Sequence, residues 1–336
     1  MIPEDSTIRR LVTAMLGAAR AGEVLSVMEI DPRLASESEA ASRAGVAMAL
    51  NVVLFADLLT RVPTAAAYVA EIRASGRKIC FDHGALRTID GPSGLLPSGT
   101  AAFARILEPL GYALAATYPL PKLTMTGYAF AHRDLAESVP QFFVSELHVA
   151  QLPEAAQAAA ERVFGNSRDP LGEAEWALLD ALARNGQCSL ETAQAGLPGL
   201  VGAFGRQHDV PARADYEALL SVTAEGAWIA TEGNAFNHAT DRVPDVMALA
   251  GALRQRGFPL KPEVEVSANG RVRQTALLAG KVLRPFRMAD SSLAEREVPG
   301  SFYEFISRDV DPATGRLDLT FDSGNATGIF AVTAAS

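Results

Sequence analysis

Residues 302–308 read FYEFISR, an aromatic and β-branched run with one carboxylate, Glu304, near its middle. This composition is typical of a β-strand, whose side chains point alternately to the two faces of a sheet. Phe302, Glu304 and Ile306 would then share one face, and both faces are largely apolar. A buried carboxylate is costly unless a cation or several hydrogen-bond donors meet it. If this segment is a buried strand, Glu304 must therefore have a partner, and the identity of that partner indicates the function of the site.

The bulk composition is that of an ordinary globular chain, with 336 residues of which 49% are hydrophobic and 21% charged. The formal net charge of −9 argues against nucleic-acid binding, which needs a basic surface. Two cysteines, Cys80 and Cys188, are too few for a disulfide framework or a thiolate zinc site. The N-terminal stretch MIPEDSTIRR does not have the pattern of a signal peptide, and no uncharged apolar run is long enough to suggest a membrane span. We therefore expect a soluble cytoplasmic protein that binds neither nucleic acid nor membrane.

The segments that precede FYEFISR show one order of elements twice. In residues 77–150, the strand RKICFDHGALRTI is followed by the helix TAAFARILEPLGY and by the strands YALAATYPL, LTMTGYAFAHR and QFFVSELHV. Residues 225–336 repeat this order. AWIATEGNAFNHAT is predicted to be a strand running into a loop, VPDVMALAGALRQRGF a helix, and EVEVSA, RVRQTALLA and SFYEFISR strands. Two further β-like pieces, RLDLTFD and TGIFAVT, close the chain.

The remaining segments are predicted to be helical. Residues 1–76 form an N-terminal helical segment, and residues 151–224 a helical insertion between the two repeated units. The sequence thus predicts an α+β fold with a βαβββ unit at 77–150 and a second at 225–336.

Three residues with metal-binding side chains stand out by their positions in the two units. His83 lies at the end of the first predicted strand of the first unit, His238 just after that of the second, and Glu304 on the last strand of the second. If the units face each other, these positions converge on one cavity. Two imidazoles and one carboxylate that leave coordination positions open form the facial triad of non-haem Fe(II) oxygenases. A divalent ion would also offset the cost of burying Glu304.

Other interpretations of the same residues are open. Glu304 could instead pair with an arginine such as Arg87 or Arg308. Arg87 follows His83 by four residues, so a continuing strand would aim both at one cavity, where an arginine suits a bidentate contact with a carboxylate. A surface ion pair would also explain Arg87, and Gln274 could point either into the cavity or to solvent.

The segments FDHGALRT, FFVSELHV, GNAFNHATDRV, RQTALLA and VPGSFYEFISR resemble the 2-oxoadipate dioxygenase/decarboxylase family, also called hydroxyglutarate synthase, of the vicinal oxygen chelate superfamily. The resemblance implies a central curved sheet of two βαβββ units around Fe(II), held by His83, His238 and Glu304. It also implies that Arg87 binds the substrate. The implied reaction uses O2 to decarboxylate and hydroxylate a 2-oxo dicarboxylic acid, turning 2-oxoadipate into 2-hydroxyglutarate and CO2 in lysine catabolism.

A second resemblance covers the end of the chain. RQTALLA, FYEFISR and FDSGNATGIFAV are similar to the C-terminal part of 4-hydroxyphenylpyruvate dioxygenase, which implies a catalytic role for Gln274 and iron binding by Glu304. Longer members of the first family carry a Val-Ser pair that holds a substrate carboxylate, and here Gly324 and Asn325 stand in its place. Asn325 can still donate hydrogen bonds, so Arg87, Gly324 and Asn325 are the expected substrate-binding residues.

Two other functions fit the same scaffold. A glyoxalase-like isomerase or lyase would use zinc, nickel or manganese and would take a fourth ligand from FFVSELHV, where Glu146 and His148 are available. A non-enzymatic binding module would hold a small molecule tightly without needing a metal. Oxygen consumption that depends on substrate separates these alternatives from the dioxygenase.

Overall fold

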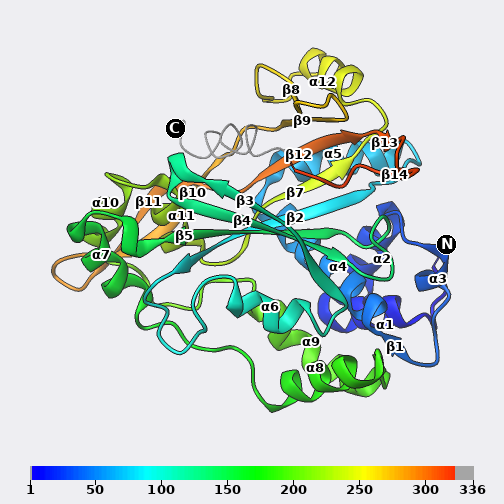
Figure 1. The fold of residues 1–336 in the computed structure, drawn as a ribbon, viewed down its shortest axis with the longest axis horizontal. Coiled ribbons are helices and arrows are strands. Elements are labelled where there is room, and N and C mark those ends of the chain that lie inside the picture. The colour runs from blue at the N-terminus through cyan, green and yellow to red at the C-terminus, as the bar shows by residue number, and fades with distance from the viewer. Residues whose placement is uncertain (1, 322–336) are drawn as a thin grey trace.

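The computed structural model describes residues 2–321. Its centre is one eight-stranded sheet, and two similar units of the chain contribute four strands each to this sheet (Figure 1). The strand order is β3-β4-β5-β2-β7-β12-β9-β8. The first unit contains β2 (Phe81–Asp90), α6 (Ala101–Leu107), β3 (Tyr112–Leu120), β4 (Met125–His132) and β5 (Gln141–His148). The second contains β7 (Phe236–Arg242), α12 (Val246–Gln255), β8 (Glu265–Val266), β9 (Val272–Ala276) and β12 (Phe302–Arg308).

The pairing pattern is the same in the two units. Strand β2 is parallel to β5 and β7 is parallel to β12, whereas the other neighbours, including β2 and β7, are antiparallel. The predicted α+β fold with two βαβββ units is therefore confirmed. Strands β2 and β7 join the units at the centre of the sheet, where Gly84 pairs with Ala239. A Cβ atom at Gly84 would lie only 2.2 Å from the Phe236 ring, so this junction requires a glycine.

Helices cover one face of this sheet. The first group is α1 (Thr7–Leu16), α2 (Ala18–Val27), α3 (Pro32–Ala35), α4 (Arg43–Arg61) and α5 (Pro63–Ala74). Phe55 of α4 contacts Tyr303, and Tyr68 of α5 contacts Tyr303 and Phe305 of β12. These contacts place Tyr303 and Phe305 on the helix side and leave Glu304 on the other face, as strand alternation predicts.

Helix α4 is the one helix of the described residues that is long and apolar enough to cross a membrane, by length and composition alone. Its apolar window is 83% buried inside the protein. Helix α4 packs against α1, α9 and β7, so its apolar character serves the core of this fold.

The chain segment that connects β5 to β7 forms a second group of helices. They are α7 (Glu154–Phe164), α8 (Glu173–Asn185), α9 (Leu190–Gly202), α10 (Arg213–Leu220) and α11 (Ala224–Glu232). Helices α8 and α9 lie beside the N-terminal helices, whereas α7, α10 and α11 gather at the opposite end of the sheet (Figure 1). Two short strands, β1 (Ala41–Ser42) and β6 (Gln187–Cys188), connect α8 and α9 to the N-terminal segment.

The structure corrects the sequence-based assignment of AWIATEGNAFNHAT (residues 227–240), because its first six residues belong to the helix α11 (Ala224–Glu232) and the strand β7 begins only at Phe236. Thr223 caps this helix by accepting a hydrogen bond from the Gly226 amide. Every residue from Glu225 to Glu232 is buried, so no exposed face marked the helical period. The two histidines also lie inside their strands and not at the strand ends, because each is the third residue of β2 or β7.

A hairpin inserted between β9 and β12 was not predicted. It consists of β10 (Lys281–Arg287), a mixture of exposed and partly buried residues, and β11 (Leu293–Pro299), which is largely exposed. Neither sequence shows the regular alternation that marks a half-buried strand. Of the predicted strand RLDLTFD (residues 316–322), the part that the structure describes, up to Phe321, contains only β14 (Arg316–Leu317), which pairs with β13 (Val310–Asp311). The predicted strand TGIFAVT lies outside the described residues.

Candidate metal centre

Three neighbouring strands bring His83, His238 and Glu304 together on the face of the sheet opposite to helices α4 and α5. One ligand atom from each residue lies within 4.8 Å of the other two, and all three side chains are buried. Nε2 of His238 is 3.1 Å from Oε2 of Glu304, and the two imidazole centroids are 5.5 Å apart. The residues singled out in the sequence therefore meet, although they are far apart along the chain.

The pKa values of these groups follow from their burial. Burial raises the pKa of Glu304 to about 8, and the charge of Glu265 acts in the same direction. Burial holds the pKa of His238 well below its usual value, with the charges of His83 and Arg87 adding to the effect. Burial also lowers the pKa of His83, despite a hydrogen bond to Asp82. Neutral imidazoles are the form that binds metals.

The surroundings of Glu304 fit a cation. Its Oε1 atom is buried and has no hydrogen-bond partner among the described residues, while Oε2 accepts a long hydrogen bond of 3.4 Å from Thr240. The alternative that an arginine neutralises Glu304 is wrong, because Arg308 pairs with Asp82 and Arg87 pairs with Glu225. A divalent ion bound by the two histidines would supply the charge that Glu304 otherwise lacks.

Arg87 is not on the surface. Its side chain is fully buried, with Nε 2.7 Å from Oε2 of Glu225 and the guanidinium 4.8 Å from the Trp228 ring centre. Burial raises the pKa of Glu225 to about 7, and the Arg87 charge opposes this rise. The surface ion pair considered for Arg87 is therefore excluded, and the guanidinium lies close enough to His238 to lower its pKa.

Gln274 is buried on β9, and its Nε2 donates to Oε2 of Glu265 at 3.3 Å. It lies directly opposite Ile306, which shares a face with Glu304, so Gln274 projects to the same face as Glu304. The alternative that it faces solvent is therefore excluded. Gly324 and Asn325 lie outside the described residues.

Glu146 and His148 form a separate cluster with Asp90. Glu146 accepts hydrogen bonds from the Thr100 amide at 2.6 Å and the Tyr128 hydroxyl at 3.3 Å. His148 contacts Thr126 through Nε2 and Asp90 through Nδ1. Among the described residues, neither joins the group of His83, His238 and Glu304 as the fourth ligand of a glyoxalase-type site.

The two units differ at the position where a further ligand could stand. Each histidine is the third residue of its unit's first strand, and the third residues of the parallel partner strands β5 and β12 are Phe143 and Glu304. In the sheet, His83 pairs with Gln141 and His238 pairs with Phe302, each the first residue of its partner strand. Phe143 and Glu304 therefore occupy equivalent positions in the two units. The second unit thus contributes a carboxylate where the first contributes an apolar ring.

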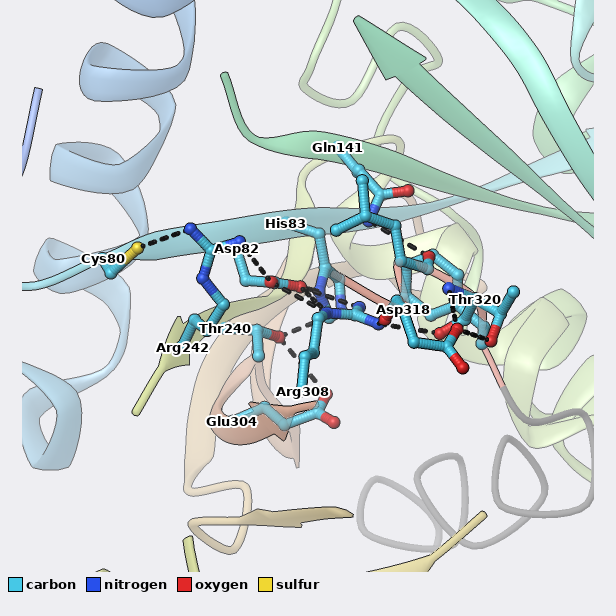
Figure 2. A network of polar contacts seen from close by, with 12 residues as sticks. Cys80, Asp82, His83, Gln141, Thr240, Arg242, Glu304, Arg308, Asp318 and Thr320 are labelled. Carbon is cyan, nitrogen blue, oxygen red and sulfur yellow. Dashed lines mark hydrogen bonds and ion pairs between the residues drawn. The ribbon is translucent and has the colours of Figure 1, made fainter. Parts of the chain in front are cut away.

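Sequence reasoning missed the polar residues around the three candidate ligands. Thr240 Oγ1 lies 3.0 Å from Nε2 of His83, and Asp82 Oδ1 lies 2.8 Å from its Nδ1 (Figure 2). Burial acts to raise the pKa of Asp82, but the Arg308 charge and the His83 hydrogen bond hold it well below its usual range. The position of Asp82 next to His83 was the available signal, but strand alternation would have placed the two on opposite faces.

A curved sheet of two βαβββ units with a buried His-His-Glu group defines a protein of the vicinal oxygen chelate class. Within this class, the chain belongs to the 2-oxoadipate dioxygenase/decarboxylase family, whose model matches residues 50–317. The chloroplastic 2-oxoadipate dioxygenase/decarboxylase of Arabidopsis thaliana is 23% identical over 302 residues, which cover 81% of this chain and 73% of that protein.

Solved structures share the fold. A glyoxalase superfamily protein from Ralstonia eutropha is 50% identical, with a TM-score of 0.90 over 94% of this chain and 98% of that one. Hydroxyglutarate synthase from Oryza sativa, solved in complex with 2-oxoadipate, is 22% identical, with a TM-score of 0.67 over 92% of this chain and 96% of that one. At this lower identity the likeness shows the fold alone.

Proposed function

We propose that this protein is an Fe(II)-dependent dioxygenase that decarboxylates and hydroxylates a 2-oxo dicarboxylic acid. The first candidate is 2-oxoadipate, which with O2 gives 2-hydroxyglutarate and CO2. The family to which the chain belongs and the 2-oxoadipate bound by the rice relative support this substrate class. We also propose a cytoplasmic location, as expected in the sequence analysis, and a place in lysine catabolism, as the family resemblance implies.

The observation that carries the proposal is the set of three buried ligand side chains, His83, His238 and Glu304. Two imidazoles and one carboxylate are the ligand set of non-haem Fe(II) oxygenases, which keep positions open for substrate and O2. Phe143 stands where the pseudo-symmetry of the sheet would put a fourth ligand. Fe(II) in this group would supply the redox chemistry with O2.

The remaining proposed roles belong to residues that bind and orient the substrate. The Arg87 guanidinium would bind the distal carboxylate, since its planar fork suits a bidentate contact, and Glu225 would hold it in place. Fixing that end of the substrate would position its reacting carbons, which can contribute several kcal/mol to lowering the barrier. Gln274, on the Glu304 face, is proposed to act on the substrate at the metal side.

Further contacts are proposed from the family resemblance and from the apolar wall beside His83. Gly324 and Asn325 are proposed to bind a substrate carboxylate. Ala85, Phe143 and Phe321 form an apolar cluster, and Phe321 packs against the His83 ring with centroids 4.8 Å apart. Such a wall would exclude water from the reacting end of the substrate.

A glyoxalase-like isomerase or lyase is the second candidate, because the Ralstonia relative is a glyoxalase superfamily protein. That name denotes a superfamily, and Glu146 and His148 make other contacts, so the donor set favours the dioxygenase. A binding module that needs no metal would leave the Glu304 carboxylate without a partner for its Oε1.

Anaerobic reconstitution with Fe(II), followed by oxygen uptake and product analysis across a panel of 2-oxo dicarboxylic acids, tests the proposal. We expect one O2 consumed and one CO2 released per substrate, and no turnover with Zn(II). Turnover with Zn(II) in the absence of O2 would identify an isomerase or lyase instead.

A further inference from the structure

A second carboxylate lies beside the candidate metal centre without belonging to the group of ligands. Oδ1 of Asp82 is 2.8 Å from Nδ1 of His83, and the two side chains are only 1% and 3% exposed. A β-bulge makes this contact possible. Phe81 pairs with Asp241 and His83 with Thr240, so Asp82 is the additional residue of β2. In a regular strand, adjacent side chains would point to opposite faces.

The Asp82 contact fixes which nitrogen of His83 is available. An ionised carboxylate can only accept hydrogen bonds, so a neutral His83 carries its proton on Nδ1. The lone pair of Nε2 then faces the side where Glu304 and His238 lie, and Thr240 Oγ1 is 3.0 Å from it. Without Asp82, His83 would also populate the other tautomer, which directs an N–H at the same place and cannot bind a metal through Nε2.

Arg308 in turn fixes Asp82. Its Nε donates to Oδ2 of Asp82 at 2.9 Å and its Nη2 to Oδ1 at 2.9 Å, and the arginine side chain is 0% exposed. The remaining nitrogen, Nη1, donates to the carbonyl oxygens of Asp318 and Thr320, each at 2.8 Å. The guanidinium therefore lies between Asp82 and the segment Asp318–Thr320 (Figure 2).

We infer that Asp82 and Arg308, 226 positions apart in the sequence, form a positioning pair that holds His83 in its metal-binding tautomer. Neither residue belongs to the His83–His238–Glu304 group. The pair also ties this tautomer to the path of the chain over the site, because the segment held by Arg308 leads directly to Phe321, which packs on His83. The inference rests on the proposed function only in taking His83 as a metal ligand.

Two variants test the pair. Asp82→Asn removes the charge and keeps the size, but it leaves Arg308 buried without a counterion, so it can weaken folding. The double variant Asp82→Leu with Arg308→Met removes both charges, and replacing a buried ion pair by apolar residues of similar volume is often neutral for stability. Glu232→Gln is the matched control. The Glu232 side chain is 3% exposed, accepts hydrogen bonds from Nε and Nη2 of Arg284, and does not belong to the group of candidate ligands.

The first readout is Zn(II) affinity, measured by competition with a chromophoric chelator. We expect both Asp82 variants to lose about 10- to 100-fold, the usual effect of removing a carboxylate that orients a metal-binding histidine, and Glu232→Gln to bind Zn(II) like the wild type. The second readout needs no metal. Selective 15N labelling of the histidines, of which the chain has only five, should show His83 protonated on Nδ1 in the wild type and as a mixture of tautomers in the double variant.

A folded double variant with wild-type Zn(II) affinity and a single Nδ1-protonated tautomer would overturn the inference. If the double variant fails to fold, Asp82→Asn with unchanged Zn(II) affinity would overturn it equally. A wild-type protein that binds no divalent metal would instead overturn the proposed function, while the 15N spectrum would still test whether Asp82 sets the tautomer.

Discussion

Nε2 of His238 lies 3.1 Å from Oε2 of Glu304, across the parallel strands β7 and β12. Thr240, which is two residues beyond His238, is the register partner of Glu304, so the imidazole and the carboxylate meet diagonally on one face of the sheet. Both groups are buried and both are shifted by burial toward their neutral forms. This contact therefore brings together two candidate metal ligands, and a cation bound between them would favour the ionised form of Glu304.

Replacing His238 with alanine should abolish turnover and lower the bound metal while the fold survives, because the imidazole is one of three proposed ligands. Metal analysis, oxygen uptake and circular dichroism check the three expectations. His208→Gln is the control, since His208 is buried against Phe164, contacts the Ala230 carbonyl and is not among the three. Full activity in His238→Ala would contradict the proposed site.

Metal binding should release a proton from Glu304 near neutral pH. The pKa of Glu304 is raised to about 8, so below that pH the metal-free carboxyl is protonated, and a cation must displace the proton. Apparent affinity should therefore fall by up to about tenfold per pH unit as the pH drops below about 8. Burial lowers the pKa of both His83 and His238, which favours the neutral imidazoles.

Calorimetric titration in buffers of different ionisation enthalpy measures this release directly. The wild type should release close to one proton at pH 7, and Glu304→Gln should release none and bind the metal weakly. A metal affinity that does not change between pH 6 and pH 8 would contradict the expected protonation of Glu304.

Arg87→Lys should impair substrates that carry a distal carboxylate, since an ammonium cannot reproduce the bidentate contact of a guanidinium. Losing a charge-assisted pair in a desolvated pocket costs about 2–5 kcal/mol, which corresponds to roughly 30- to several-thousand-fold in kcat/KM. The loss should be small for a 2-oxo acid with an apolar tail, and the metal content should not change.

The control for this prediction is Arg284→Lys, which makes the same exchange at an arginine that pairs with another buried carboxylate, Glu232, and has no proposed role in binding. It should retain the preference for a distal carboxylate even if it lowers thermal stability. If Arg87→Lys lost activity equally on both kinds of substrate while keeping its metal, Arg87 would not bind the distal carboxylate.

Gly84→Ala should destabilise the junction of the two units by about 1–3 kcal/mol, the usual cost of overpacking a core, because the new methyl group would overlap the Phe236 ring. Gly251→Ala is the matched control. Its Cβ meets nothing within 4 Å on helix α12, so it should stabilise the protein by about 0.5–1 kcal/mol. Urea unfolding followed by circular dichroism measures both changes, and equal stability of the two variants would contradict the packing at the junction.

Local patterns in the sequence accounted for much of the sheet. The strand compositions of FDHGALRT and FYEFISR, together with the helix between each first and second strand, predicted two βαβββ units before any contact was known. Alternation along FYEFISR placed Glu304 opposite to Tyr303 and Phe305, and the helix contacts of those two rings agree. Elements without one apolar and one polar face were missed, because α11 is buried on all sides and β11 is mostly exposed.

By itself, the sequence determined the order of elements in the two units, apart from the first strand of the second, and the identity of three residues with metal-binding side chains. It did so because the burial of most of these elements is visible in the periodicity of their own residues. Only the tertiary structure decided which charged groups meet. The bulge that turns Asp82 toward His83, and the distant Arg308 and Glu225 that pair with Asp82 and Arg87, depend on sheet register and on helix packing. These contacts join segments far apart in the chain, and side-chain periodicity within a segment contains no information on the partner it will meet.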